Sequence, residues 1–148
     1  MAESNTSRWP AYGRVPPFLP VPLRARADGW TPERQARFIG LLAETGSVAE
    51  AARRAGMSRE SAHRLRQRPG AGSFAHAWDA IVALRGGGQV EDRKITLEEL
   101  AELAFDGPFH VLIRRQRFVR ASRKPSTSAL LRQVRRLDAL VAKRGLEW

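Results

Sequence analysis

Arginine side chains are concentrated between residues 53 and 68, where they could bind a polyanion. Only three of the 26 basic residues in the chain are lysine. The planar guanidinium group forms paired hydrogen bonds with phosphate oxygens and with the edge of guanine. A GC-rich genome also favours arginine, so the position of these residues is stronger evidence than their number. The arginines of this stretch are Arg53, Arg54, Arg59, Arg64, Arg66 and Arg68.

Residues for catalysis or metal binding do not cluster in the sequence. His63, His76 and His110 are dispersed, and the chain of 148 residues has no cysteine. Disulfides, thiolate zinc sites and a cysteine nucleophile are therefore excluded. No glycine-rich loop is followed by the lysine of a nucleotide-binding motif. The sequence predicts a binding protein and not an enzyme, with no cofactor and no metal.

The charge is distributed unevenly along the chain, whose formal net charge is +11. Residues 1–29 carry +2 and residues 30–70 carry +4, whereas residues 71–108 carry −4 and residues 109–148 carry +9. Two basic blocks therefore flank an acidic one. This pattern indicates a protein that binds a polyanion and keeps a separate face for another contact.

The spacing of small and apolar residues over 48–67 predicts two short helices that cross closely. A tiny side chain is needed at the crossing, and a residue that tolerates positive φ is needed four positions later, in the turn. One apolar residue must follow the turn, and two more must lie one helical turn apart on the inner face of the second helix. The residues that meet these requirements are Ala52, Gly56, Met57, Ala62 and Leu65.

Residues 44–65, with the sequence ETGSVAEAARRAGMSRESAHRL, resemble the helix-turn-helix families of bacterial regulators. Together with the preceding helix, which begins near Trp30, the segment resembles a trihelical, homeodomain-like unit. The elements predicted from Trp30 to about Asp138 are also similar to a group of small bacterial helix-turn-helix proteins related to phage terminase small subunits.

The resemblance implies that the second helix of the motif, about Ser58–Gln67, lies in the major groove of double-stranded DNA. Its outward side chains would then contact base edges: Arg59, Glu60, Ser61, His63, Arg64 and Gln67. Other residues would hold the DNA backbone. These are Ser58, Arg53, Arg54, Arg66 and Arg68 around the motif, and Arg114, Arg115, Arg117, Arg120, Arg123 and Lys124 further along the chain.

The remaining patterns predict a mainly α fold in which a trihelical helix-turn-helix domain precedes a C-terminal helix, β-hairpin and helix. Capping residues predict helices that begin after Thr31, Ser47, Ser58, Ser73 and Thr96. Both Ser47 with Glu50 and Thr96 with Glu99 have the spacing of a capping box. The domains expected are a flexible Pro/Arg-rich arm over 1–29, the DNA-binding domain over 30–85, a glycine-containing linker over 86–95, and the C-terminal part over 96–148.

The arm over residues 1–29 holds five of the nine prolines, which favour extended backbone. It is either a disordered tail or a basic arm that follows phosphates or enters a minor groove.

Two short β-prone runs, Phe109–Ile113 and Arg117 to Arg120 or beyond, predict a hairpin, although the turn lacks a preferred Asn-Gly or Asp-Gly pair. Its basic residues would either clamp DNA or protect the sheet edge from aggregation.

A last helix is expected from about Ser128 to Lys143. Its apolar stripe of Leu130, Val134, Leu137 and Val141 either packs on its own domain or forms a homodimer.

The acidic helix that precedes the hairpin carries Glu98, Glu99, Glu102 and Asp106. It presents either a solvated face or a surface for the transcription machinery, a packaging enzyme or another protein.

A sequence-specific transcriptional regulator is the leading hypothesis for function. A phage-derived terminase small subunit or DNA-packaging recognition protein is the first alternative, with a regulator of a prophage or gene-transfer element between the two. An architectural DNA-binding protein is the second alternative. No apolar run is long enough to cross a membrane and the N-terminus does not resemble a signal peptide, so a cytoplasmic, nucleoid-associated protein is expected.

Overall fold

The computed structural model describes residues 9–10, 13–24 and 26–145. The prediction of a mainly α chain with one antiparallel hairpin is confirmed for this part of the chain. Its helices are α2 (Pro32–Thr45), α3 (Val48–Arg54), α4 (Arg59–Arg66), α5 (Gly72–Arg85), α6 (Leu97–Phe105) and α7 (Thr127–Arg144). The hairpin strands are β1 (Phe109–Arg114) and β2 (Arg117–Arg123).

Helix α2 begins and ends where its sequence predicts. The Thr31 hydroxyl accepts a hydrogen bond from the Arg34 N–H at 3.1 Å, and Pro32 occupies the first turn, where its missing N–H costs nothing. At the other end Gly46 adopts a φ of 70° and donates its N–H to the Leu42 carbonyl. These caps fix the length of the helix around which the rest of the body packs.

The two predicted capping boxes differ in outcome. At α6 both halves form, because the Thr96 hydroxyl accepts from the Glu99 N–H and the Glu99 carboxylate accepts from the Thr96 N–H. At α3 only the Ser47 hydroxyl caps the helix. The Glu50 carboxylate binds arginines instead, and the Ser47 N–H is satisfied by the Thr45 hydroxyl at 3.2 Å.

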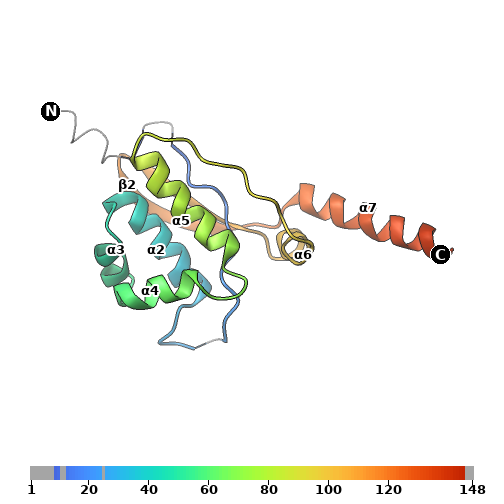
Figure 1. Ribbon diagram of the computed structural model, residues 1–148, viewed down its shortest axis with the longest axis horizontal. Helices are drawn as coiled ribbons and strands as arrows, with labels where there is room; N and C mark the ends of the chain where they lie inside the picture. The colour runs from blue at the N-terminus through green and yellow to red at the C-terminus, as the bar shows by residue number, and fades with distance from the viewer. Residues whose placement is uncertain (1–8, 11–12, 25, 146–148) are drawn as a thin grey trace.

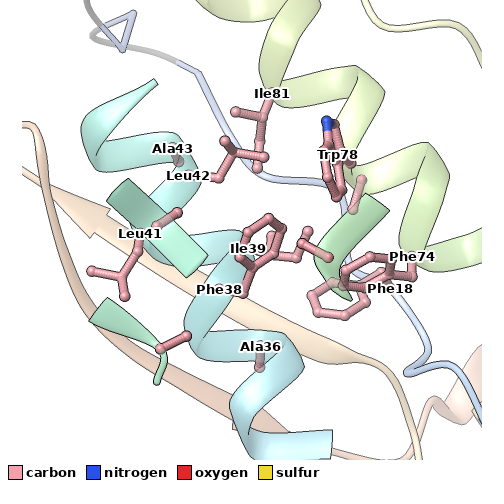
Figure 2. Close-up of a cluster of buried hydrophobic side chains, with 14 of the residues drawn as sticks. Phe18, Ala36, Phe38, Ile39, Leu41, Leu42, Ala43, Phe74, Trp78 and Ile81 are labelled. Atoms are coloured by element: carbon pink, nitrogen blue, oxygen red, sulfur yellow. The ribbon is translucent and has the colours of Figure 1, made fainter. Parts of the chain in front are cut away.

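The core surrounds Phe38 on α2, whose side chain is fully buried (Figure 2). Its ring lies 5.4 Å from Trp30, 6.1 Å from Phe74 and 5.1 Å from Trp78, measured between ring centroids. Because Phe74 and Trp78 belong to α5, this aromatic cluster holds α5 against α2.

The described part of the N-terminal segment is not a flexible arm, so that prediction is wrong for residues 13–24. The apolar residues between its prolines are buried, and Phe18 pairs with Phe109 as an added bridge on β1, with N–O distances of 2.8 and 3.2 Å. Burial of this apolar surface offsets the entropy of ordering an extended chain. The expectation for residues 1–8, 11–12 and 25 lies outside the described residues. The buried side chains are Trp9, Val15, Phe18, Leu19 and Val21.

Two glutamine side chains hold this extended segment by its backbone. Gln35, which has no exposed surface, accepts from the Val21 N–H at 2.7 Å and donates to the carbonyls of Val21 and Trp30. Gln116 in the hairpin turn accepts from the Trp9 N–H at 2.8 Å and donates to the Trp9 carbonyl at 2.6 Å. A segment with no regular partner strand along most of its length thereby satisfies its polar backbone groups.

Replacing Gln35 by leucine is expected to lower the free energy of unfolding by about 2–4 kcal/mol, because buried groups of Val21 and Trp30 lose their partners. Urea denaturation followed by circular dichroism measures this difference. The matched control is Gln89→Leu in an exposed loop, which is expected to change stability by less than about 0.5 kcal/mol. Equal stability of the two variants would show that the Gln35 amide does not anchor the segment.

The hairpin packs directly on α2, so the sheet belongs to the main core and not to a separate C-terminal domain. The ring of Phe118 crosses Gly40 so closely that it leaves no space for a Cβ at that position. The hairpin turn is formed by Arg115 and Gln116, which adopt positive φ values of 52° and 68° without a glycine. The prediction of two domains divided at residues 86–95 therefore does not hold for β1 and β2.

Helices α6 and α7 form a smaller unit at the base of the hairpin (Figure 1). Leu100 and Ala104 of α6 bury Ala129 of α7, and the Ser126 N–H donates to the Leu103 carbonyl at 2.8 Å. Beyond this contact α7 projects away from the body, at the end opposite the hairpin tip (Figure 1).

Candidate nucleic-acid interface

The turn between α3 and α4 has the geometry that its spacing predicts. Gly56 adopts a φ of 79°, and the Met57 N–H donates to the Ala52 carbonyl at 2.8 Å. Ala52 and Ala62 are fully buried and Leu65 is 2% exposed. The small inner faces of the two helices therefore meet, and the face of α4 opposite Ala62 and Leu65 is exposed.

Most of the side chains predicted to contact bases are exposed on the outer face of α4. Ser61 differs, because its hydroxyl donates to the Ser58 carbonyl at 2.8 Å and accepts from the Trp30 indole N–H at 3.3 Å. A half-buried hydroxyl with both partners inside the protein is a support for the helix and not a free contact, which corrects that assignment. The exposed residues are Arg59, Glu60, His63, Arg64 and Gln67.

Two of the residues predicted to contact DNA, His63 and Arg66, pack against helix α5. The Arg66 guanidinium lies 2.9 Å from the Asp79 carboxylate and 4.8 Å from the centroid of the Trp78 ring. The His63 ring lies 5.3 Å from the same ring. Arg66 therefore contacts both Asp79 and Trp78 of α5, and its predicted contact with the DNA backbone stays a prediction. His63 is exposed.

The arginines of α3 are paired with carboxylates at the surface. Arg53 lies 2.6 Å and Arg54 2.9 Å from Glu50, and Arg54 also lies 2.7 Å from Glu44. The hydrogen bonds from Arg53 and Arg54 lower the pKa of the Glu50 carboxyl, and the same contact raises the pKa of Arg53. Exposed pairs of this kind are weak and exchange readily, so these arginines can still reach another anion.

The six basic residues of the hairpin region do not form one patch. Arg114, Arg115 and Arg117 lie at the tip, whereas Arg120 is exposed farther along β2. Arg123 is at the base, where it donates to the Gly107 carbonyl at 2.7 Å and to Glu102 at 3.0 Å, over the Phe109 ring.

Strand geometry separates the tip of the hairpin from its base by about 17 Å. Arg123 is thus half-buried and paired at the base of the hairpin, away from the tip, and Lys124 is exposed beside it. That these two residues contact DNA stays a prediction.

The hairpin tip lies next to α3. The Glu44 carboxylate accepts from the Phe118 N–H at 2.9 Å, and Arg115, Gln116 and Arg117 line a shallow recess with Glu44 and Arg54. In Figure 1 the tip, α3 and the start of α4 lie at the same end of the body. Glu44 and Phe118, 74 positions apart in the sequence, thus hold the hairpin tip beside α3. We call the surface formed by Arg54, Arg114, Arg115 and Arg117 the basic end. No sequence pattern linked Glu44 to the hairpin.

No protein-family model, curated protein or solved structure matches this chain. None of the helices in the described part of the chain is both long enough and apolar enough to span a bilayer.

Two of the four acidic residues predicted for a free surface on helix α6 are paired with arginines of the same chain. Glu99 binds Arg93 at 2.8 Å, which lowers the pKa of the Glu99 carboxyl, and Glu102 binds Arg123. Burial raises the pKa of Glu102 despite that arginine. Glu98 and Asp106 remain exposed, so they are the acids of α6 that can face a partner.

Proposed function

We propose that this protein binds double-stranded DNA sequence-specifically as a transcriptional regulator, with α4 in the major groove. The observation that carries the proposal is the division of α4 into two faces. Ala62 and Leu65 alone are buried, whereas Arg59, Arg64 and Gln67 project into solvent from a helix that α3 and α5 hold in place. A rigid helix with long polar side chains on its free face fits the width of the major groove.

The chemistry of the free face suits base edges. Arg59 and Arg64 can each form two hydrogen bonds with guanine, Gln67 can form two with adenine, and Glu60 can accept from cytosine. His63 presents one ring edge at the same surface. Four residue types with different donor and acceptor patterns on one helix favour recognition of sequence over binding to any duplex.

The basic end supplies contacts to phosphates. Arg114, Arg115 and Arg117 flank the motif on one side, and Arg68 follows α4 on the other. Such contacts position a recognition helix without reading sequence. Ser58 and the start of α4 offer a helix N-terminus, which also favours a phosphate.

Selection from a random duplex library, followed by fluorescence anisotropy on the selected and a scrambled duplex, tests the proposal. We expect binding to the selected duplex to be about 10³-fold tighter or more. Equal affinity for both duplexes would indicate an architectural binder. No binding at low salt would overturn DNA binding itself. Genome-wide crosslinking then distinguishes a transcriptional regulator from a packaging or architectural protein, because a regulator is expected to give sharp peaks upstream of promoters.

Single arginine substitutions are expected to separate reading from positioning. Arg64→Ala should weaken binding to the selected duplex by about 1–3 kcal/mol and reduce the preference over the scrambled duplex. Arg115→Ala should weaken both duplexes equally, because it removes a phosphate contact. Arg132→Ala, which removes the same charge from α7 at the far end of the molecule, is the matched control. If the Arg64 and Arg115 variants behave alike, α4 does not read bases.

A further inference from the structure

The apolar stripe of α7 is exposed along most of its length. Of the 18 residues in this helix only Ala129 is buried, and it is covered by α6. Five large apolar side chains of α7 are 39–54% exposed, and Val141 is half-buried. The five are Leu130, Leu131, Val134, Leu137 and Leu140. Within the described residues α6 covers only one side of α7, so a contiguous apolar stripe on this helix is left for another contact.

We propose that α7 pairs antiparallel with α7 of a second copy of this chain. Leu130, Val134, Leu137 and Val141 follow a four-three-four spacing, which is that of a coiled-coil seam. A two-fold pair buries the same stripe on both copies. The pairing itself does not depend on the proposed DNA binding.

The charges on α7 allow a second copy to approach. With about 100° between successive residues, Arg132, Arg135 and Arg136 lie on the side of the helix opposite the seam. The positions beside the seam are held by Leu131, Gln133, Asp138, Leu140 and, at the C-terminal end, Arg144. Along most of the seam two copies therefore meet through apolar and uncharged groups, with Asp138 and Arg144 as the charged residues beside it.

The ends of α7 decide the orientation. Its last turn is basic, with Lys143 and Arg144, and its first turn has no acid. Beside that first turn lies the acidic helix α6, since Gly107 comes into close contact with the backbone at Lys124 and Pro125. In an antiparallel pair the basic end of each α7 reaches the partner's α6, where Glu98 and Asp106 are exposed. A parallel pair would instead bring two basic ends together.

Sedimentation equilibrium of the full chain tests the pairing. The expected mass is about 33 kDa, twice the 16.5 kDa of one chain. Leu137→Asp should weaken dimerisation at least about 100-fold, since the side chain enters the seam twice in a two-fold pair. Val82→Asp, at a 57% exposed apolar residue of α5, is the matched control and should leave the mass unchanged. Circular dichroism verifies that both variants fold. A monomer at every concentration, or a ring of many subunits, would overturn the proposal.

Cysteine crosslinking tests the orientation, because the chain has no native cysteine. A mixture of Asp106→Cys and Arg144→Cys proteins, treated with a short bismaleimide, should give a mixed crosslinked dimer. Arg144→Cys alone should stay uncrosslinked. A crosslinked Arg144→Cys homodimer, or a dimer without the mixed product, would overturn the antiparallel arrangement. Because neither experiment contains DNA, a failure of the proposed function would leave these results unaffected.

Discussion

Raising the salt concentration from about 50 to about 200 mM is expected to lower the affinity for duplex DNA by about 10³-fold, because each cation that contacts a phosphate releases a counterion. Six exposed arginines are available around the proposed interface. If each meets one phosphate, the logarithm of the affinity falls with that of the salt concentration at a slope of about −5. The six are Arg59, Arg64, Arg68, Arg114, Arg115 and Arg117.

Replacing the three tip arginines Arg114, Arg115 and Arg117 by alanine should roughly halve that slope, to about −2.7, because three of the six phosphate contacts are lost and each contributes about 0.9. The matched variant replaces Arg132, Arg135 and Arg136, which lie at the other end of the molecule on the side of α7 opposite the seam, and should keep the full slope. Anisotropy titrations at four salt concentrations measure both. A tip variant with an unchanged slope would place the phosphate contacts elsewhere on the protein.

Replacing Phe38 by alanine is expected to lower the free energy of unfolding by about 3–5 kcal/mol. The substitution leaves a cavity at the centre of the aromatic cluster and removes ring contacts with Phe74 and Trp78 (Figure 2) and with Trp30. A loss of this size is a large share of the stability of an ordinary domain and corresponds to a fall in Tm of about 10 °C.

Phe105→Ala is the control for that measurement, because its side chain is 67% exposed and its loss is expected to cost less than about 0.5 kcal/mol. Thermal and urea denaturation of the two variants under the same conditions give the comparison. Equal stability would mean that the cluster around Phe38 is not the centre of the core.

Local structure is largely predictable from the sequence because it depends on neighbouring residues. Thr31, Ser47, Ser58 and Thr96 cap helices as expected, since each side chain satisfies an N–H only three residues away. The sequence predicts that Ser73 caps α5, whereas the helix begins at Gly72 and has no side-chain cap. The Ser73 hydroxyl accepts from the Leu19 N–H instead.

Long-range contacts are the part that could not be predicted. The sequence predicts a mobile proline-rich segment because the residues that hold it, Gln35, Phe109 and Gln116, lie outside the segment. No local pattern around these three residues indicates that they bind its backbone. The same holds for the division of the basic hairpin into a free tip and a bound base, which follows from Glu102 and the Gly107 carbonyl lying beside Arg123. The free face of α4 was predictable in all but Ser61, whose partner Trp30 lies 31 residues away.

The hydrogen bonds between Gln116 and Trp9 join residues 107 positions apart, and this separation determines the order in which the protein can fold during its synthesis. Helices α2 to α5 depend on contacts within about fifty residues and can assemble as they are synthesised. The segment that contains Trp9 and Phe18 is synthesised before β1 and the hairpin turn, so these two side chains stay uncovered until both have been made. The docking of this segment is therefore expected to be the last folding step of the body. Until residue 116 has emerged from the ribosome, the nascent chain is expected to be a substrate for chaperones.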